Sequence, residues 1–258
     1  MSTWVLLRGL TREARHWGEF PRLFAERIEG AQVHLVDLPG NGRLHGLTSP
    51  ATVPGLLDHV RAGLVGEGVP PPYHLLAMSL GAMVAVDWCA RHPNELAGAV
   101  LINTSLRPFS PLHQRLRPHN LAVLLRLMGA GDRDRERAVL RLTSQRDGDD
   151  PGWLDDWVAW RHEHRVSRTN ALRQLLAAAR YSAPRARPAV PMLVLGSAGD
   201  CLVDPRCSLA LARRWGTAFA QHPSAGHDLP LDDGPWVAGR VRAWLQAGSA
   251  STSSSAWI

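Results

Sequence analysis

The chain has 258 residues, of which 45% are hydrophobic and 20% are charged. This composition is typical of a globular protein with one large core, and it excludes a disordered chain, a coiled coil and a collagen-like fibre. The formal net charge is +6, and all 29 basic residues are arginine. Because we find no apolar run long enough for a membrane span, no secretory leader and only three cysteines in no framework spacing, we expect a cytoplasmic protein.

Strand-like and helix-like segments alternate through the first hundred residues. Short apolar runs that end at turn residues predict strands, and apolar residues at helical spacing predict helices. The predicted strands are 3–7, 33–38, 73–78 and 96–103, and the helices between them are 17–28, 53–65 and 80–92. This alternation predicts a mostly parallel sheet with helices on both faces.

The alternation stops between residues 106 and 188, where only helices are predicted. They cover 121–128, 133–142, 153–164 and 170–181. This stretch holds 16 arginines against nine acidic residues, so it carries the whole positive excess of the chain. Strands at 190–195 and 218–221 and helices at 206–215 and 236–246 then restore the alternation. We therefore expect an α/β core made of residues 1–105 and 189–247, a helical lid inserted at 106–188 and a flexible tail at 248–258.

Ser79 lies between a predicted strand and a predicted helix, in the sequence Ala77-Met78-Ser79-Leu80-Gly81. This is the setting of a nucleophile elbow, a sharp turn that presents a serine hydroxyl at the carboxyl end of a sheet and needs small residues on both sides. The N-terminus of the following helix favours the negative charge that develops there. An ordinary helix start with Ser79 as its N-cap is the alternative interpretation.

Two later loops supply an acid and a base in the order that such an elbow predicts. Asp200 follows the first strand after the helical stretch, and His227 follows the last strand. Because the carboxyl ends of parallel strands meet at one edge of a sheet, both side chains should lie near Ser79. The histidine would take the serine proton while the aspartate orients the histidine. Asp204, in the same loop as Asp200, is the alternative acid.

The loop after the first strand, Arg8-Gly9-Leu10, is the second part of a predicted oxyanion hole. Backbone N–H groups of Leu10 and Leu80 would bind the oxyanion of a tetrahedral intermediate. Gly9 permits the backbone to approach closely.

These motifs resemble those of the α/β-hydrolase family, in particular the lidded serine hydrolases related to carboxylesterases and the pimeloyl-carrier-protein methyl ester esterase. The resemblance runs from residue 4 to about residue 245 and rests on Arg8-Gly9-Leu10 with Trp17, residues 37–42, Ser79-Leu80-Gly81, residues 196–200 and Gly226-His227. It implies a Ser79, Asp200 and His227 triad with Leu10 and Leu80 as oxyanion donors, and neither a cofactor nor a metal. Arg8 departs from the family, which commonly has histidine there.

The predicted lid carries two candidate recognition features. Trp153, Trp157 and Trp160 share one face of a predicted helix, where they either pack the lid onto the core or form an aromatic wall of the substrate pocket. Arginines of the lid, among them Arg161 and Arg165, would suit an acidic carrier protein. No nucleic-acid-binding motif is present, and no histidines have the spacing of metal ligands.

From these residues we predict a serine hydrolase that cleaves a small-molecule carboxylic ester through an acyl-enzyme intermediate. One alternative is a lyase, synthase or C–C hydrolase on the same scaffold, acting on an anionic substrate held by Arg8. Another is a non-enzymatic binding protein with a decayed site. A serine at position 79 argues against the members of the fold that use a carboxylate nucleophile.

Overall fold

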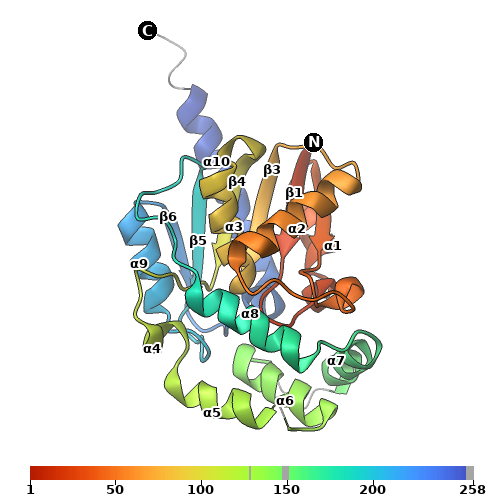
Figure 1. Cartoon of the computed structure of the whole chain (residues 1–258). Helices are drawn as coiled ribbons and strands as arrows, with labels where there is room; N and C mark the ends of the chain where they lie inside the picture. The colour runs from red at the N-terminus through yellow and green to blue at the C-terminus, as the bar shows by residue number, and fades with distance from the viewer. Residues whose placement is uncertain (128, 147–150, 254–258) are drawn as a thin grey trace.

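The computed structural model describes residues 1–127, 129–146 and 151–253. Within them, six strands form one parallel sheet in the order β2-β1-β3-β4-β5-β6 (Figure 1). The strands are β1 (Ser2–Leu7), β2 (Ala31–Val36), β3 (Tyr73–Met78), β4 (Leu96–Ile102), β5 (Met192–Ser197) and β6 (Ala218–His222). The strand order reverses between β1 and β3, and ligands of open parallel sheets bind at the carboxyl ends of the strands at such a point.

Helices cover both faces of this sheet. On one face lie α2 (Val53–Gly66), α3 (Leu80–Arg91) and α9 (Arg206–Trp215), and on the other lie α1 (Phe20–Arg27) and α10 (Leu229–Ser253). Helix α10 is interrupted by non-helical backbone at Asp233. Short 3-10 turns cover Ala14–Trp17, Gly42–Leu44 and Pro93–Glu95. The predicted parallel sheet with helices on both faces is confirmed.

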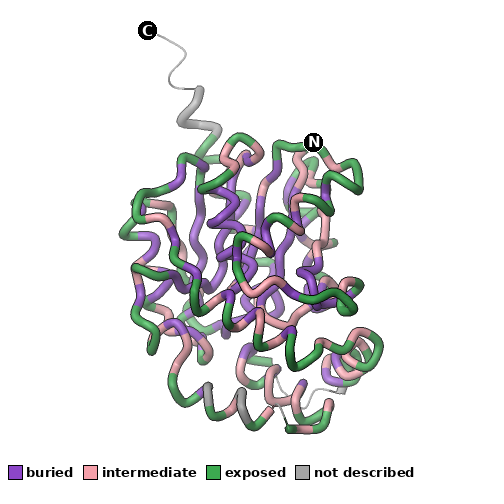
Figure 2. Tube along the Cα trace, viewed as in Figure 1, coloured by how far each residue is buried: buried purple, intermediate pink, exposed green. Residues whose placement is uncertain are grey.

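The core follows from the two-residue period of the strands. In β1, Val5 and Leu7 pack into the cluster under α2 and α3, whereas Trp4 and Leu6 pack into the cluster under α1 and α10. Successive side chains of a strand point to opposite faces, so a strand buried on both sides is apolar throughout. Figure 2 shows this burial along the strands and the inner sides of the covering helices.

The chain between β4 and β5, which we call the β4–β5 segment (residues 103–191), carries the remaining α-helices of the described residues. It contains α4 (Leu112–Arg115), α5 (Pro118–Leu127), α6 (Asp132–Thr143), α7 (Pro151–Glu163) and α8 (Arg168–Arg180). Figure 1 shows these helices at the end of the molecule to which the strands point. The short helix α4 is the one that the sequence did not predict.

Two boundaries at the end of the chain bear on the predictions. Helix α10 begins at Leu229, seven residues before the predicted helix, and continues to Ser253, so it includes part of the predicted tail. Residues 254–258 lie outside the described residues. Among the helices that the structure describes, we find none with the length and apolar character of a membrane span.

Candidate active site

Ser79 joins β3 to α3 in a sharp turn. Its backbone adopts φ 54° and ψ −119°, a conformation that non-glycine residues rarely occupy and that surrounding structure must hold in place. The N–H of Ser79 donates to the carbonyl of Ile102 at 3.0 Å, and its carbonyl accepts from the hydroxyl of Thr104 at 3.1 Å. The Ser79 side chain makes no capping hydrogen bond to α3, so the N-cap interpretation does not describe it.

Two glycines let the loop after β1 press against this turn. A Cβ atom on Gly81 would lie 2.5 Å from the carbonyl oxygen of Leu7, and one on Gly9 would lie 3.0 Å from the Cβ of Ser79. Neither position has room for a side chain without movement of its neighbours. The close approach brings Leu10 and Leu80 to the wall of the same cavity as Ser79.

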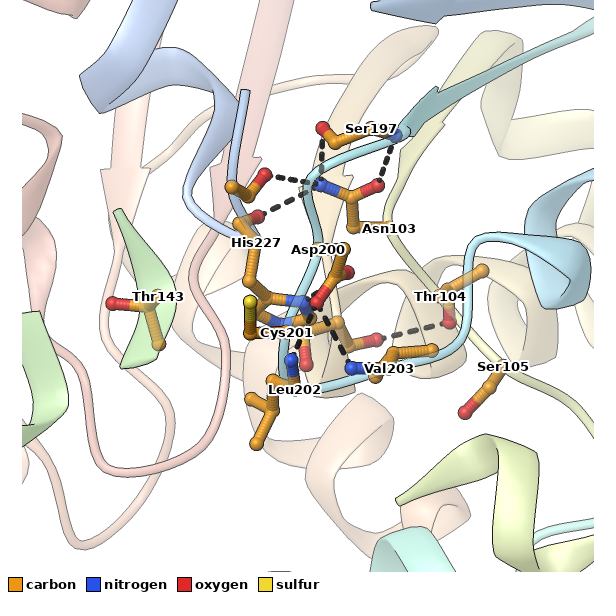
Figure 3. Close-up of polar contacts among 12 residues, drawn as sticks. Asn103, Thr104, Ser105, Thr143, Ser197, Asp200, Cys201, Leu202, Val203 and His227 are labelled. Atoms are coloured by element: carbon orange, nitrogen blue, oxygen red, sulfur yellow. Dashed lines mark hydrogen bonds and ion pairs between the residues drawn. The ribbon is translucent and has the colours of Figure 1, made fainter. Parts of the chain in front are cut away.

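His227 and Asp200 form a buried pair at the ends of the last two strands. The Nδ1 atom of His227 lies 2.7 Å from Oδ2 of Asp200, while Oδ1 of Asp200 accepts the N–H groups of Leu202 at 2.8 Å and Val203 at 2.9 Å (Figure 3). His227 is 4% exposed and Asp200 is 2% exposed. Because the carboxylate accepts from Nδ1, the proton of neutral His227 sits there and Nε2 is left as a proton acceptor.

The surroundings of His227 set its affinity for a second proton. Burial alone would lower the pKa of His227, but the charge of Asp200 and its hydrogen bond outweigh burial, so the pKa is raised above the ordinary value of 6.5. Asp204, the alternative acid, instead pairs with Arg206, and this contact lowers the pKa of Asp204 to about 2. The structure thus brings Asp200, and not Asp204, to His227.

Asn103 is a buried polar residue of the site that no sequence motif predicted. It follows β4 with φ 45°, a conformation that asparagine tolerates. Its Nδ2 donates to the carbonyl of His227 at 2.9 Å and of Gly226 at 3.2 Å, and also to the hydroxyl of Ser197 at 2.9 Å (Figure 3). Its Oδ1 accepts the N–H of Ser197. Asn103 therefore joins the loop that holds His227 to the ends of β4 and β5. In the sequence, its position at the end of a predicted strand is the one feature that could have indicated a role in the site.

Arg8 is paired with a carboxylate inside the protein, while its Nε is buried without a hydrogen-bond partner. Its guanidinium forms a two-point contact with Asp228, at 3.0 Å and 2.5 Å, and lies over the ring of Trp17 at 4.8 Å. Arg8 and Asp228 are each 2% exposed, so this ion pair is buried beside His227. Arg8, which the sequence suggested as the cation for an anionic substrate, thus already has a carboxylate partner.

Ser79 and His227 open into one cavity of about 180 Å³ between the sheet edge and the β4–β5 segment. Leu10 and Leu80 lie on its wall. Most other lining side chains are apolar; they include Met83, Leu112, Leu116, Val139, Leu142, Leu175, Leu202 and Val203. Such a cavity suits an apolar group next to a polar reacting centre.

The three tryptophans of α7 lie elsewhere. Trp157 is fully buried and packs with Leu140 and Leu231, and Trp153 and Trp160 pack against that cluster. Among the described residues that line the cavity of Ser79, none of the three occurs. In the part of the chain that the structure describes, no cluster of His, Cys, Asp or Glu is placed to hold a metal ion.

Comparisons with known proteins find relatives in sequence and in fold. The pimeloyl-[acyl-carrier protein] methyl ester esterase of Chromobacterium violaceum is 34% identical to this chain over 125 residues, which is 47% of each chain. The protein of the same name from Methylococcus capsulatus is 35% identical over 98 residues, which is 38% of this chain and 35% of that one. These matches span less than half the length of either relative.

Solved structures match over nearly the whole chain at lower identity. A thermophilic esterase from Thermogutta terrifontis is 20% identical with a TM-score of 0.74, covering 96% of this chain and 90% of that one. An enol-lactonase from Burkholderia xenovorans LB400 is 18% identical with a TM-score of 0.78, covering 95% and 91%. The model of the alpha/beta hydrolase family matches residues 4–240. The chain therefore belongs to the alpha/beta hydrolase family.

Proposed function

We propose that the protein is a serine hydrolase that cleaves carboxylic esters through an acyl-enzyme intermediate. The observation that carries this proposal is that Ser79 and His227 line one mostly apolar cavity, while Asp200 is bonded to Nδ1 of His227. The names of the two curated relatives and of the solved esterase support ester hydrolysis.

In the first half-reaction, the hydroxyl oxygen of Ser79 attacks the ester carbonyl while Nε2 of His227 takes the hydroxyl proton. The negative charge that forms on the carbonyl oxygen is held by the N–H groups of Leu10 and Leu80. Asp200 stabilises the imidazolium of His227 without taking its proton. The imidazolium then protonates the departing alcohol, and the acyl group stays on Ser79.

In the second half-reaction, water attacks the acyl group while His227 accepts a proton from it. Collapse of the second tetrahedral intermediate releases the carboxylic acid and returns the proton to Ser79. We propose that the β4–β5 segment acts as the predicted lid, because its residues Leu112, Val139 and Leu175 line the cavity opposite Ser79. A lid of this kind shields the reaction from bulk water.

The alternatives receive less support from the contacts. A lyase or synthase of the predicted kind would use Arg8 to bind an anionic substrate. Asp228 already neutralises the charge of Arg8, so this contact does not support that alternative. A decayed binding protein would have no need of the strained Ser79 backbone or of the Asp200 contact with His227. Both features are costly to retain without catalysis.

An acidic carrier protein as bearer of the ester is a separate prediction. Arg161 and Arg165 each contact Asp132, so these two cations are partly neutralised within the segment. Arg165→Gln should lower kcat/KM for a carrier-linked ester and leave that for a free ester unchanged. Equal kcat/KM for the carrier-linked ester in both proteins would argue against this surface as the docking site.

The proposed function is tested by hydrolysis of p-nitrophenyl acetate, butyrate, hexanoate and decanoate by the wild type and by Ser79→Ala. We expect the variant to lose roughly four orders of magnitude in kcat or more, with an unchanged melting temperature. Full activity of folded Ser79→Ala would refute the mechanism. The wild-type series also measures the length of acyl chain that the cavity accepts.

A further inference from the structure

Arg115, the last residue of α4, is a buried cation in the wall of the cavity that contains Ser79. It is 7% exposed. Its Nη2 donates to the carbonyl of Ala178 at 2.6 Å and its Nη1 to the carbonyl of Ala179 at 3.4 Å, both in the last turn of α8. Its Nε is buried without a hydrogen-bond partner. Such an orphaned donor is costly unless a ligand completes it. The Nε of Arg8 in the same cavity is orphaned in the same way, so it is the charge of Arg115 that sets it apart.

The charge of Arg115 has no carboxylate counterpart among the described residues. Burial and the nearby charge of Arg107 lower the pKa of Arg115, and no aspartate or glutamate acts in the opposite direction. The two α8 carbonyls supply only the negative end of a helix dipole, equivalent to about half a charge. Buried charges are normally paired, so part of the Arg115 charge is left without compensation.

Two other arginines that line the same cavity, unlike Arg115, are paired with carboxylates. Arg8 is paired with Asp228, and Arg12 is paired with Glu136. Among the described arginines that line the cavity, Arg115 is therefore the one whose charge a ligand can still neutralise. A doubly charged phosphate would call for more than one such cation, whereas a single carboxylate matches one guanidinium in charge and in planar geometry.

We propose that Arg115 binds a free carboxylate of the substrate, so that the preferred substrate is a half-ester of a dicarboxylic acid. The ester group would lie at Ser79 and the carboxylate at Arg115, with an apolar chain between them along the leucines of the wall. This inference rests on the proposed esterase function and deepens it. It moves the anion-binding role from Arg8, which the sequence suggested, to a residue that the sequence did not single out.

The test compares monomethyl with dimethyl esters of dicarboxylic acids, from succinate upward in chain length. For the best chain length we expect kcat/KM of the wild type to favour the monoester. In Arg115→Gln this preference should fall about ten- to a hundred-fold, as for loss of a charge-assisted hydrogen bond. Arg115→Lys should keep part of the preference because it keeps the charge. Arg126→Gln, which removes an exposed arginine of α5, is the matched control and should behave as the wild type.

A purely structural role of Arg115 makes the opposite prediction. If the guanidinium only caps α8, Arg115→Gln should lower the melting temperature and reduce kcat/KM of both esters by the same factor, and this result would overturn the proposal. A wild type that hydrolyses diesters but shows no preference for monoesters would overturn it too, while leaving the esterase function intact. Calorimetric binding of the monoester to Ser79→Ala, lost in Ser79→Ala/Arg115→Gln, provides a readout that does not depend on turnover.

Discussion

At the scale of single residues, His227 has one carboxylate in contact and a second one next to it in the chain. Asp200 bonds to its ring, whereas Asp228 is turned to Arg8. The charge of Asp228 raises the pKa of His227 and the charge of Arg8 lowers it. The buried Arg8–Asp228 pair therefore places a carboxylate beside His227, the proposed base, while the charge of Arg8 limits the effect of that carboxylate on the pKa of His227.

Removal of Arg8 should move the pH dependence of activity. His227 acts as a base only when neutral, so kcat/KM falls as pH drops through the pKa of His227, which lies above 6.5. In Arg8→Gln the charge of Asp228 is uncompensated and favours the imidazolium, so the acidic limb of the pH profile of kcat/KM should shift to higher pH. The double variant Arg8→Gln/Asp228→Asn should move it back. If the acidic limb of the pH profile does not move in folded Arg8→Gln, the charge of Asp228 does not act on the pKa of His227 as we expect.

Asn103 should act as a positioning residue for His227. Asn103→Asp keeps the shape of the side chain but loses the two N–H donors to the carbonyls of Gly226 and His227. We expect kcat to fall about ten- to a hundred-fold with KM nearly unchanged, because the change acts on the position of His227. The measurement is steady-state kinetics beside thermal unfolding. Loss of stability with normal kcat in the folded fraction would assign Asn103 a structural role alone.

At the scale of elements, the site depends on how closely β1, β3 and α3 approach one another. Gly81, in the first turn of α3, lies against the carbonyl oxygens at the end of β1, where a Cβ atom has no space. A residue larger than glycine at position 81 would push the turn at Ser79 away from the end of β1. The start of α3 at Leu80 is thus selected as much by packing on β1 as by local propensity.

This packing gives a stability prediction with a matched control. Gly81→Ala should lower the free energy of unfolding by about 3 kcal/mol, because the backbone atoms it meets cannot turn aside. Gly63→Ala, in the exposed part of α2 with nothing within 4 Å of the added Cβ, should raise it by about 0.5 to 1 kcal/mol. Urea unfolding of both variants measures the difference; equal effects would contradict the close approach.

A second contact between elements joins the loop after β1 to the β4–β5 segment. Glu136 of α6 is 2% exposed and bonds to Arg12 and Arg161. Glu136→Gln should destabilise the protein by about 2 to 3 kcal/mol, less than the full cost of a broken buried pair because Arg161 also contacts Asp132.

The control for Glu136 is Asp155→Asn. The ion pair of Asp155 with Arg133 is exposed, and exposed pairs contribute little. Limited proteolysis should cut the β4–β5 segment faster in Glu136→Gln than in Asp155→Asn. Equal cleavage rates in the two variants would show that Glu136 does not hold the segment.

At the scale of the whole molecule, the site lies at the carboxyl edge of the sheet where strand order reverses. Its parts come from the first strand, the third strand and the last two loops, and the β4–β5 segment closes the cavity over them. A parallel sheet brings these distant parts together through its topology alone. The rigid sheet also explains how a strained turn at Ser79 is held.

The same topology decides what the sequence could predict. Apolar runs and turn residues predicted the strands and the larger helices, since these patterns are local. Order along the chain placed Ser79, Asp200 and His227 at one edge. The contacts of Arg8 with Asp228 and of Arg115 with the end of α8 join residues far apart in the chain, and no local pattern encodes them. The role of the α7 tryptophans likewise depended on which helix face meets the core.

Fluorophosphonate labelling, located by peptide mass spectrometry, most directly tests whether Ser79 is an activated nucleophile. We predict one label per chain, on Ser79, with labelling abolished in Ser79→Ala and strongly slowed in His227→Ala, because the serine is activated by the histidine. Asp228→Asn, which leaves the ring contact of His227 with Asp200 in place, should still be labelled. A label on a different residue, or ester hydrolysis by a wild type that takes no label, would contradict the proposed mechanism.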